Sequence, residues 1–270
     1  MSRRPISGEG VPGRLTARTP RVAAALDSMG GFAALVTGVG GRLGRRPLEL
    51  AAFVEQLEIV GVRSISLTAL TAMFSCMVVA IQFTLQMARF GAQDYVGQVV
   101  SVSQVRELGP VLTALIAGGR IGAGITAELG AMKVTEQIDA IRSMGADPVR
   151  KLVIPRVLAA IVALPILTMT ANIVGIGSAM VMARLQSGVA MARFYHASVR
   201  AVTMSDVLGG LGKAAFFGAL IALIACHQGL VADGGTTGVG RATTRTVVLA
   251  SLATLVSDFA FTKVLLLLGI

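Results

Sequence analysis

The sequence predicts an all-α integral membrane protein with five transmembrane helices preceded by an amphipathic interfacial helix. Hydrophobic residues make up 54% of the 270 residues and charged residues only 14%, whereas soluble domains average about 45–50% and about 25%. The apolar residues also gather in long segments, and a helix needs about 20 of them to cross the hydrocarbon core of a bilayer. Composition and segment length together therefore favour a membrane protein over a soluble domain.

The first 46 residues form a basic tail, in which eight arginines face only Glu9 and Asp27. We expect this tail to be cytoplasmic, partly amphipathic or disordered, and attracted to anionic lipid. A weak helical pattern, diluted by glycines, runs through residues 22–43. Nucleic acid is not an expected partner, because the tail has almost no aromatic residues and precedes a membrane domain. No secretory signal is expected in this segment.

Residues 47–270 are predicted to form the membrane domain, and they begin with an interfacial helix at 47–63. Pro47 suits a first-turn position, and Glu49, Gln56 and Arg63 lie away from the apolar positions. The apolar residues fall on one face of this helix: Leu50, Phe53, Val54, Leu57 and Val60. A helix with one such face is expected to lie in the membrane interface and to lead into the first span.

The five predicted spans cover about residues 65–88, 98–130, 152–183, 207–232 and 246–270. The apolar core of the second span, 108–119, is too short alone, so this span must include charged residues. With the N-terminus inside, the inner segments carry sixteen Lys and Arg and the outer segments carry four. The positive-inside rule therefore predicts a cytoplasmic N-terminus and a C-terminus on the outer side of the membrane.

A short amphipathic helix is predicted at about 135–145, between the second and third spans. Ile138, Ile141 and Met144 fall on one side of it. Thr135 is the expected N-cap, and Gly145 and Pro148 are expected to stop the helix. From these residues alone, an ordinary surface connector is an equally good interpretation.

Several kinds of chemistry are not expected. The stretch GGLGKAAF at 209–216 has Ala214 where a phosphate-binding loop needs Ser or Thr, so the chain is not expected to hydrolyse ATP. Cys76 and Cys226 lie inside apolar segments and fit packing better than a disulfide. His196 and His227 lack the spacing of metal ligands. No catalytic residues, metal or cofactor are therefore predicted.

The second span carries a strip of small residues at every fourth position. The strip consists of Ala114, Gly118, Gly122, Thr126 and Gly130. Strips of this kind let helix backbones approach closely in lipid. Static helix packing is the simpler interpretation, and a helix that slides during transport is the functional one.

Charged residues within the spans are the best candidates for a site, because a charge at the bilayer centre costs about 2.5–3.5 kcal/mol on insertion scales. Arg120 and Glu128 can be interfacial residues near the cytoplasmic side. Four others are predicted to line a polar cavity that opens toward the outer leaflet: Arg106, Glu107, Lys213 and Asp258. A structural ion-pair network that holds the bundle together is the alternative.

Several ordered blocks of the sequence are similar to one known family. The block RELGPVLTALIAGGRIGAGITAELGAMKVTEQIDAIRSMGADPVRKLVIPR begins at residue 106, and GVGRATTRTVV (238–248) and SDFAFTKVL (257–265) follow it. These blocks resemble the signature of the MlaE/YrbE family, the permease subunits of Mla- and Mce-type lipid ABC transporters. The likeness covers about residues 47–270.

The resemblance implies a homodimeric permease with a cytoplasmic ABC ATPase, an Mce-domain substrate-binding protein and phospholipid as partners. It places Arg106, Glu107, Lys213 and Asp258 at a lipid cavity formed between the two copies. It also places the helix that couples to the ATPase at residues 135–145, with contacts from Glu136, Gln137, Asp139 and Arg142. An ion-coupled secondary transporter of an amphiphilic solute and a non-transporting scaffold are the alternatives.

Overall fold

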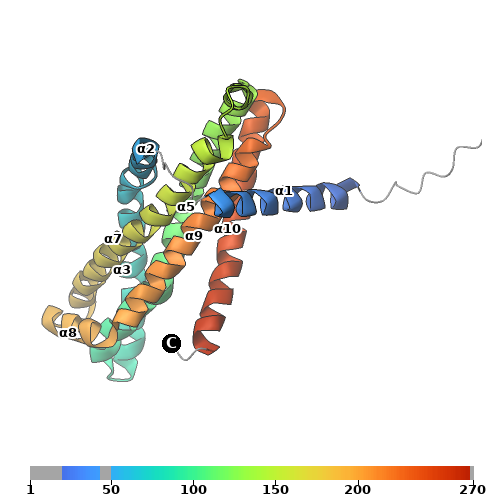
Figure 1. The fold of residues 1–270 in the computed structure, drawn as a ribbon. Coiled ribbons are helices and arrows are strands. Elements are labelled where there is room, and N and C mark those ends of the chain that lie inside the picture. The colour runs from blue at the N-terminus through green and yellow to red at the C-terminus, as the bar shows by residue number, and fades with distance from the viewer. Residues whose placement is uncertain (1–19, 43–49, 268–270) are drawn as a thin grey trace, which may run out of the picture.

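The computed structural model describes residues 20–42 and 50–267, and Figure 1 shows that this part of the chain is built from helices. No strand occurs within the described ranges. Five helical stretches are long and apolar enough to cross a membrane: Leu50–Arg89, Gln93–Val134, Val149–Gln186, Met204–Leu230 and Gly235–Val264. The predicted fold class is therefore confirmed. Half of the predicted basic tail, residues 1–19 and 43–46, lies outside the described residues.

The helices follow one another with short connections. In chain order they are α1 (Pro20–Arg42), α2 (Leu50–Val60), η1 (Val62–Ser64), α3 (Ile65–Arg89), η2 (Gln93–Tyr95), α4 (Val96–Ser103), η3 (Gln104–Leu108), α5 (Gly109–Val134), α6 (Gln137–Ser143), η4 (Val149–Val153), α7 (Ile154–Ser187), α8 (Met191–Ala201), α9 (Met204–Leu230) and α10 (Gly235–Leu267). Of the short η elements, η1 and η2 are 3₁₀ turns, whereas η3 and η4 are π-helical.

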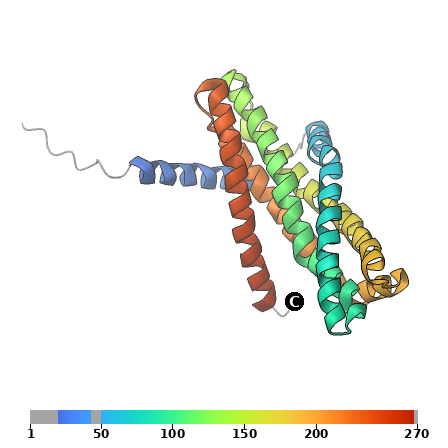
Figure 2. The same ribbon diagram turned by 180° about the vertical axis from the view of Figure 1, so that it is seen from behind.

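Helix α5 lies in the middle of the bundle and packs against α9 and α10, while α3 packs mainly against α7. Figure 2 shows α10 running beside α5 along one side of the bundle. The face of α3 that is buried repeats every four residues and consists of Thr68, Ala72, Cys76, Ala80 and Thr84. Side chains this small let α3 and α7 approach closely, which in lipid is a main source of helix–helix attraction.

Two stretches that hydropathy treats as loops contain helix. Helix α10 begins at Gly235, eleven residues before the predicted start of the last span at 246. The polar threonines of this added part bond back to the helix, since the hydroxyls of Thr243 and Thr244 donate to the Gly240 carbonyl at 2.7 and 3.2 Å. Within the predicted outer loop 184–206, the structure forms α8. A hydropathy window records composition and misses helices that are polar on one side.

Helix α2 precedes the first span, as predicted, but its two faces are used differently from the prediction. Leu50 and Val54 are 69% and 60% exposed, so the described residues leave part of its apolar face uncovered. Gln56, predicted to lie away from the apolar positions, is buried together with Val60 where α2 meets α7. The exposed apolar side chains suit a helix that lies against lipid.

Helix α1 crosses the bundle at a steep angle to the spans and extends away from it (Figure 1). Of its described side chains, Leu35 and Val39 are buried, and the Phe32 ring meets the His227 ring of α9 edge-on. At its C-terminus, Arg42 pairs with Asp147 at 2.6 Å, just beyond α6. These contacts hold α1 against α9 and the α6 end of the bundle.

Candidate functional site

The π-helical segment η3 interrupts the second span just before Pro110. A proline has no N–H, so the carbonyl four residues before it loses its helical partner. That carbonyl belongs to Arg106, and the Lys213 ammonium donates to it at 3.3 Å. The Gly109 N–H bonds instead to the Gln104 carbonyl, five residues back. A break in the backbone ladder thus brings a cation from α9 onto the second span.

Lys213 is the centre of a polar cluster that joins η3, α9 and α10. Its Nζ donates to both carboxylate oxygens of Glu107 at 2.8 Å and to the Thr262 hydroxyl at 2.8 Å. Asp258 Oδ1 lies 3.4 Å away. The Thr262 hydroxyl is also 3.1 Å from Glu107 Oε1. Three of the four predicted cavity residues, Glu107, Lys213 and Asp258, are therefore brought together.

The Lys213 cluster contains one ammonium group and two carboxylates. The Lys213 side chain is only 2% exposed, so its positive charge must be stabilised by the carboxylates around it. Two carboxylates, Glu107 and Asp258, share this one ammonium, and their side chains are 40% and 20% exposed. With both carboxylates ionised the cluster carries an excess negative charge, and its Glu107 edge is open to a further hydrogen-bond donor or cation.

The Arg106 side chain, the fourth predicted cavity residue, does not join the Lys213 cluster. It turns to Asp206 at the start of α9, where Nε and Nη2 both lie 2.5 Å from Oδ1. Asp206 is only 3% exposed and is part of a capping box, since it also accepts from the Thr203 N–H at 2.8 Å. Arg106 itself is 44% exposed. Adjacent residues of η3 thus present a cation and an anion, each paired with α9.

Sequence reasoning missed two members of this region, Asp206 and Thr262. A signal existed for Asp206, because Thr203 and Asp206 have the spacing of a capping box at a helix start. Thr262 follows Asp258 by four residues, so both lie on one face of the last span. Gly210, on α9, lies against the Val105 carbonyl, and a Cβ there would collide with this backbone. Only glycine lets α9 approach η3 this closely.

The predicted strip of small residues faces α9 and α10. Ile221 fills the space beside Gly118, Thr246 and Ile221 lie beside Gly122, and Val239 lies beside Gly130. The fourth member, Thr126, hydrogen-bonds to the Ala225 carbonyl at 3.0 Å and to the Thr246 hydroxyl at 2.8 Å. Ala114, the first member, is 2% exposed. The strip thus lies where the second span packs most closely on its neighbours.

The other two charges of the second span also have partners. Arg120 donates to the Arg63 carbonyl at 2.9 Å and to the Ser64 hydroxyl at 2.8 Å. Glu128 pairs with Arg156 at 2.6 Å, and the Arg156 side chain is only 5% exposed. Glu128 is therefore more than a solvated residue at the interface, because it neutralises a buried cation of α7.

The predicted coupling residues lie on α6 and its N-cap. Ile138 and Ile141 are buried and hold the helix against the bundle, whereas Met144 is 74% exposed and does not share their role. The four predicted contacts are all exposed: Glu136, Gln137, Asp139 and Arg142. The prediction of Thr135 as the N-cap is wrong, because the Thr135 hydroxyl donates to the Ala131 carbonyl in the last turn of α5. Glu136 takes the position instead, with φ 59°.

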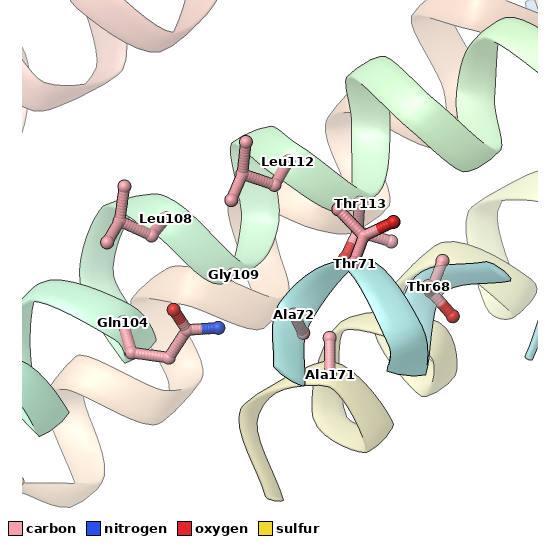
Figure 3. A pocket seen from close by; sticks show the side chains of 9 residues that line it. All are labelled: Thr68, Thr71, Ala72, Gln104, Leu108, Gly109, Leu112, Thr113 and Ala171. Carbon is pink, nitrogen blue, oxygen red and sulfur yellow. The ribbon is translucent and has the colours of Figure 1, made fainter. Parts of the chain in front are cut away.

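On the other side of η3, an uncharged pocket lies between α3, α5 and α7 (Figure 3). It is small, with a cavity volume of about 10 Å³, and is lined by Thr68, Thr71, Ala72, Gln104, Leu108, Gly109, Leu112, Thr113 and Ala171. The Gln104 side chain accepts from the Cys76 thiol at 2.9 Å and donates to Asn172 at 3.4 Å. The π-helical segment therefore directs polar groups to two opposite sides of the span.

Comparison with known protein families bears directly on this architecture. The sequence profile of the family Permease MlaE matches residues 53–264. The chain belongs to the MlaE permease family. It is thus a membrane permease of the ABC-transporter type, and the charged residues of η3, α9 and α10 and the whole of α6 fall within the matched region. Helix α1 precedes the matched region.

Individual members of the MlaE family support the same assignment. A probable ABC transporter permease protein of Rickettsia typhi is 38% identical over 219 residues, which cover 81% of this chain and 85% of that protein. One from Synechocystis is 39% identical over 219 residues, 81% of each chain. The intermembrane phospholipid transport system permease protein MlaE of Haemophilus influenzae is 37% identical over 213 residues, 78% of this chain and 82% of that protein.

Proposed function

We propose that this chain moves phospholipid or a related lipid between the inner membrane and an Mce-type periplasmic carrier. A separate cytoplasmic ABC ATPase would supply the energy. Membership of the MlaE permease family supports this proposal, and the Haemophilus influenzae relative is named for intermembrane phospholipid transport. The proposal includes a multi-pass inner-membrane location with the N-terminus in the cytoplasm and the C-terminus in the periplasm.

The observation that carries the proposal is the pair of unlike charges on η3, at a membrane-spanning helix. Arg106 and Glu107 are 44% and 40% exposed, so each keeps an accessible edge beyond its partner on α9. A zwitterionic headgroup carries a phosphate and an ammonium. The guanidinium of Arg106 matches the phosphate, and the open carboxylate of Glu107 matches the ammonium. We therefore assign the headgroup position of the lipid to these two side chains, with Lys213 and Asp258 behind them.

A second copy of the chain would complete the lipid cavity. Next to Asp258, α10 presents apolar side chains that the described residues leave largely uncovered: Leu252, Val256 and Phe259 are 56%, 69% and 72% exposed. Spaced by three and four residues, they form one stripe. A partner copy and the acyl chains of a bound lipid are the apolar surfaces that suit such a stripe. The homodimer is therefore part of the proposal.

Helix α6 is proposed to couple the permease to the ATPase. Its exposed polar residues project from a helix that Ile138 and Ile141 hold against the bundle. Because α6 joins α5 to η4 and α7, a displacement of α6 acts at once on two spans. Glu136, Gln137, Asp139 and Arg142 are the proposed contacts.

The experiment that tests the headgroup site is Glu107→Gln in the permease expressed with its ATPase. We expect several-fold less copurified phospholipid and several-fold slower lipid transfer, because the amide keeps the shape and loses the charge. Glu55→Gln, an exposed glutamate of α2, is the matched control and should leave both unchanged.

Unchanged lipid content and transfer in a normally assembled Glu107→Gln dimer would contradict the headgroup assignment and favour a scaffold role. Transport by the purified chain alone, driven by an ion gradient, would instead favour the ion-coupled transporter. The two rivals are thus separated by whether transport persists and by what drives it.

A further inference from the structure

Helix α8 lies across one end of the bundle, the end opposite α6 (Figure 1). It connects the end of α7 directly to the start of α9. Two side chains fix it to α4: Phe194 is 1% exposed, and the Ser101 hydroxyl donates to the Ser198 hydroxyl at 2.8 Å. Gly97 lies against the Phe194 backbone, where a larger residue would collide. The position of α8 is therefore fixed by packing.

The remaining surface of α8 divides into two stripes. One stripe is apolar and consists of Met191, Tyr195 and Val199, which are 36%, 57% and 58% exposed and follow one another every four residues. The other stripe is polar and consists of Arg193, His196 and Arg200, all exposed. At 100° per residue, the apolar stripe lies between the buried anchor and the polar stripe. A helix lying in a membrane interface has this arrangement.

The charge of α8 points to a phosphate surface. The helix contains two arginines and no acidic residue. Arg193 pairs with Asp94 at 2.9 Å, but both side chains are more than 60% exposed, so this pair is weak. Arg200 has no ion-pair partner within the described ranges. Tyr195 combines an apolar ring with a polar hydroxyl, the property that places tyrosines at headgroup level.

We propose that α8 binds the phospholipid surface of the leaflet at its own end of the bundle. Met191, Tyr195 and Val199 enter the boundary between headgroups and acyl chains, and Arg193 and Arg200 bond to lipid phosphates. The occupant is a lipid surface for two reasons. The apolar stripe adjoins the membrane-spanning bundle, and among the described residues the two arginines of α8 have only one carboxylate partner, Asp94. This inference requires only that the chain spans a bilayer, and it is independent of lipid transport.

Site-directed spin labelling tests this inference in the full chain, reconstituted in phosphatidylcholine vesicles with phosphatidylglycerol. Nitroxides are attached singly at Val199→Cys and at His196→Cys, three residues apart on the two stripes. The native Cys76 and Cys226 are both buried and should not react. We expect the label at 199 to collide with oxygen and to be several-fold less accessible than that at 196 to a water-soluble nickel chelate.

Equal nickel accessibility at the two positions would overturn the proposal and leave the apolar stripe as a docking surface for a protein. The arginine contribution is tested by Arg200→Glu in the Val199→Cys background. We expect the nickel accessibility at 199 to rise, because a carboxylate is repelled by the anionic surface. If phosphatidylglycerol-containing vesicles show no change, Arg200 makes no phosphate contact and the lipid assignment of the polar stripe fails.

Discussion

The second span, formed by η3 and α5, uses the same kind of charge pair in different ways near its two ends. At each end a half-exposed glutamate meets a buried cation from a neighbouring helix: Glu107 with Lys213, and Glu128 with Arg156. Lys213 is surrounded by acceptors from η3 and α10. Arg156 donates to Glu128 and to the carbonyl of Leu152, which lies four residues earlier in the chain. Its Nε has no hydrogen-bond partner in the described structure.

The difference lies in charge balance. The pair of Glu128 and Arg156 is electrically neutral, so it is well suited to hold α5 against α7. The Lys213 cluster has a second carboxylate, Asp258, and therefore an unmet capacity for a positively charged or hydrogen-bonding group. A pair that only joins helices needs no such excess. We therefore expect mutations at the α6 end to act on stability and those at the η3 end to act on lipid binding.

The largest effect on stability is expected for Glu128→Gln. Arg156 would remain as a buried cation without a carboxylate partner, and breaking a fully buried pair costs about 3–5 kcal/mol, which is an upper bound here because Glu128 is 49% exposed. Thermal unfolding in detergent should show a clear drop in Tm. The double variant Glu128→Gln with Arg156→Met removes both charges and should recover most of it. A single variant as stable as the wild type would show that water reaches Arg156 and that the pair is not structural.

A smaller effect on stability and a larger one on lipid is expected for Asp258→Asn. Lys213 keeps Glu107 at 2.8 Å, so the charge stays neutralised, and losing a charged hydrogen bond costs about 1.5–3 kcal/mol. Copurified phospholipid, measured by mass spectrometry, should fall several-fold. Thr262→Val is the matched variant, since it removes a neutral partner of Lys213 at nearly constant volume. If Asp258→Asn loses stability and keeps its lipid, the two ends of the second span are alike after all.

The smallest effect on stability is expected for Asp139→Arg on α6. Asp139 makes two ion pairs of 3.2 Å, with Lys133 and Arg142, on an exposed surface. Such pairs contribute about 0–1 kcal/mol each. The membrane fold should therefore stay intact while copurification of the ATPase weakens. Normal binding and stimulation of the ATPase would leave α6 as a plain connector, and Ser143→Arg on the same exposed helix is a control for added charge.

Hydrophobic segment length was enough to predict the five-span class, because burying about 20 apolar residues in lipid dominates every local preference. Helix ends were harder, as α10 shows. Its first turns are rich in threonine and glycine, which hydropathy treats as a loop, although Val239 in these turns packs beside Gly130 of α5. The sequence also singled out Glu107, Lys213 and Asp258 as costly charges in lipid. Their pairing depends on the directions of the η3 side chains. A π-helical segment changes these directions, and hydropathy does not reveal a π-helical segment.

The π-helical segment η3 determines what a single-codon deletion in this span would do. A π-helical turn contains one residue more than an α-helical turn, so residues 104–108 behave as a one-residue insertion accommodated just before Pro110. Deleting a single codon there would give an uninterrupted helix of nearly the same apolar length, still able to enter the membrane. The flanking helices would keep nearly the same register, because the widened turn had absorbed the extra residue, whereas the side chains of η3 itself would lose their present directions. Such an allele would encode a permease that inserts normally and has lost the alignment of η3 with α9.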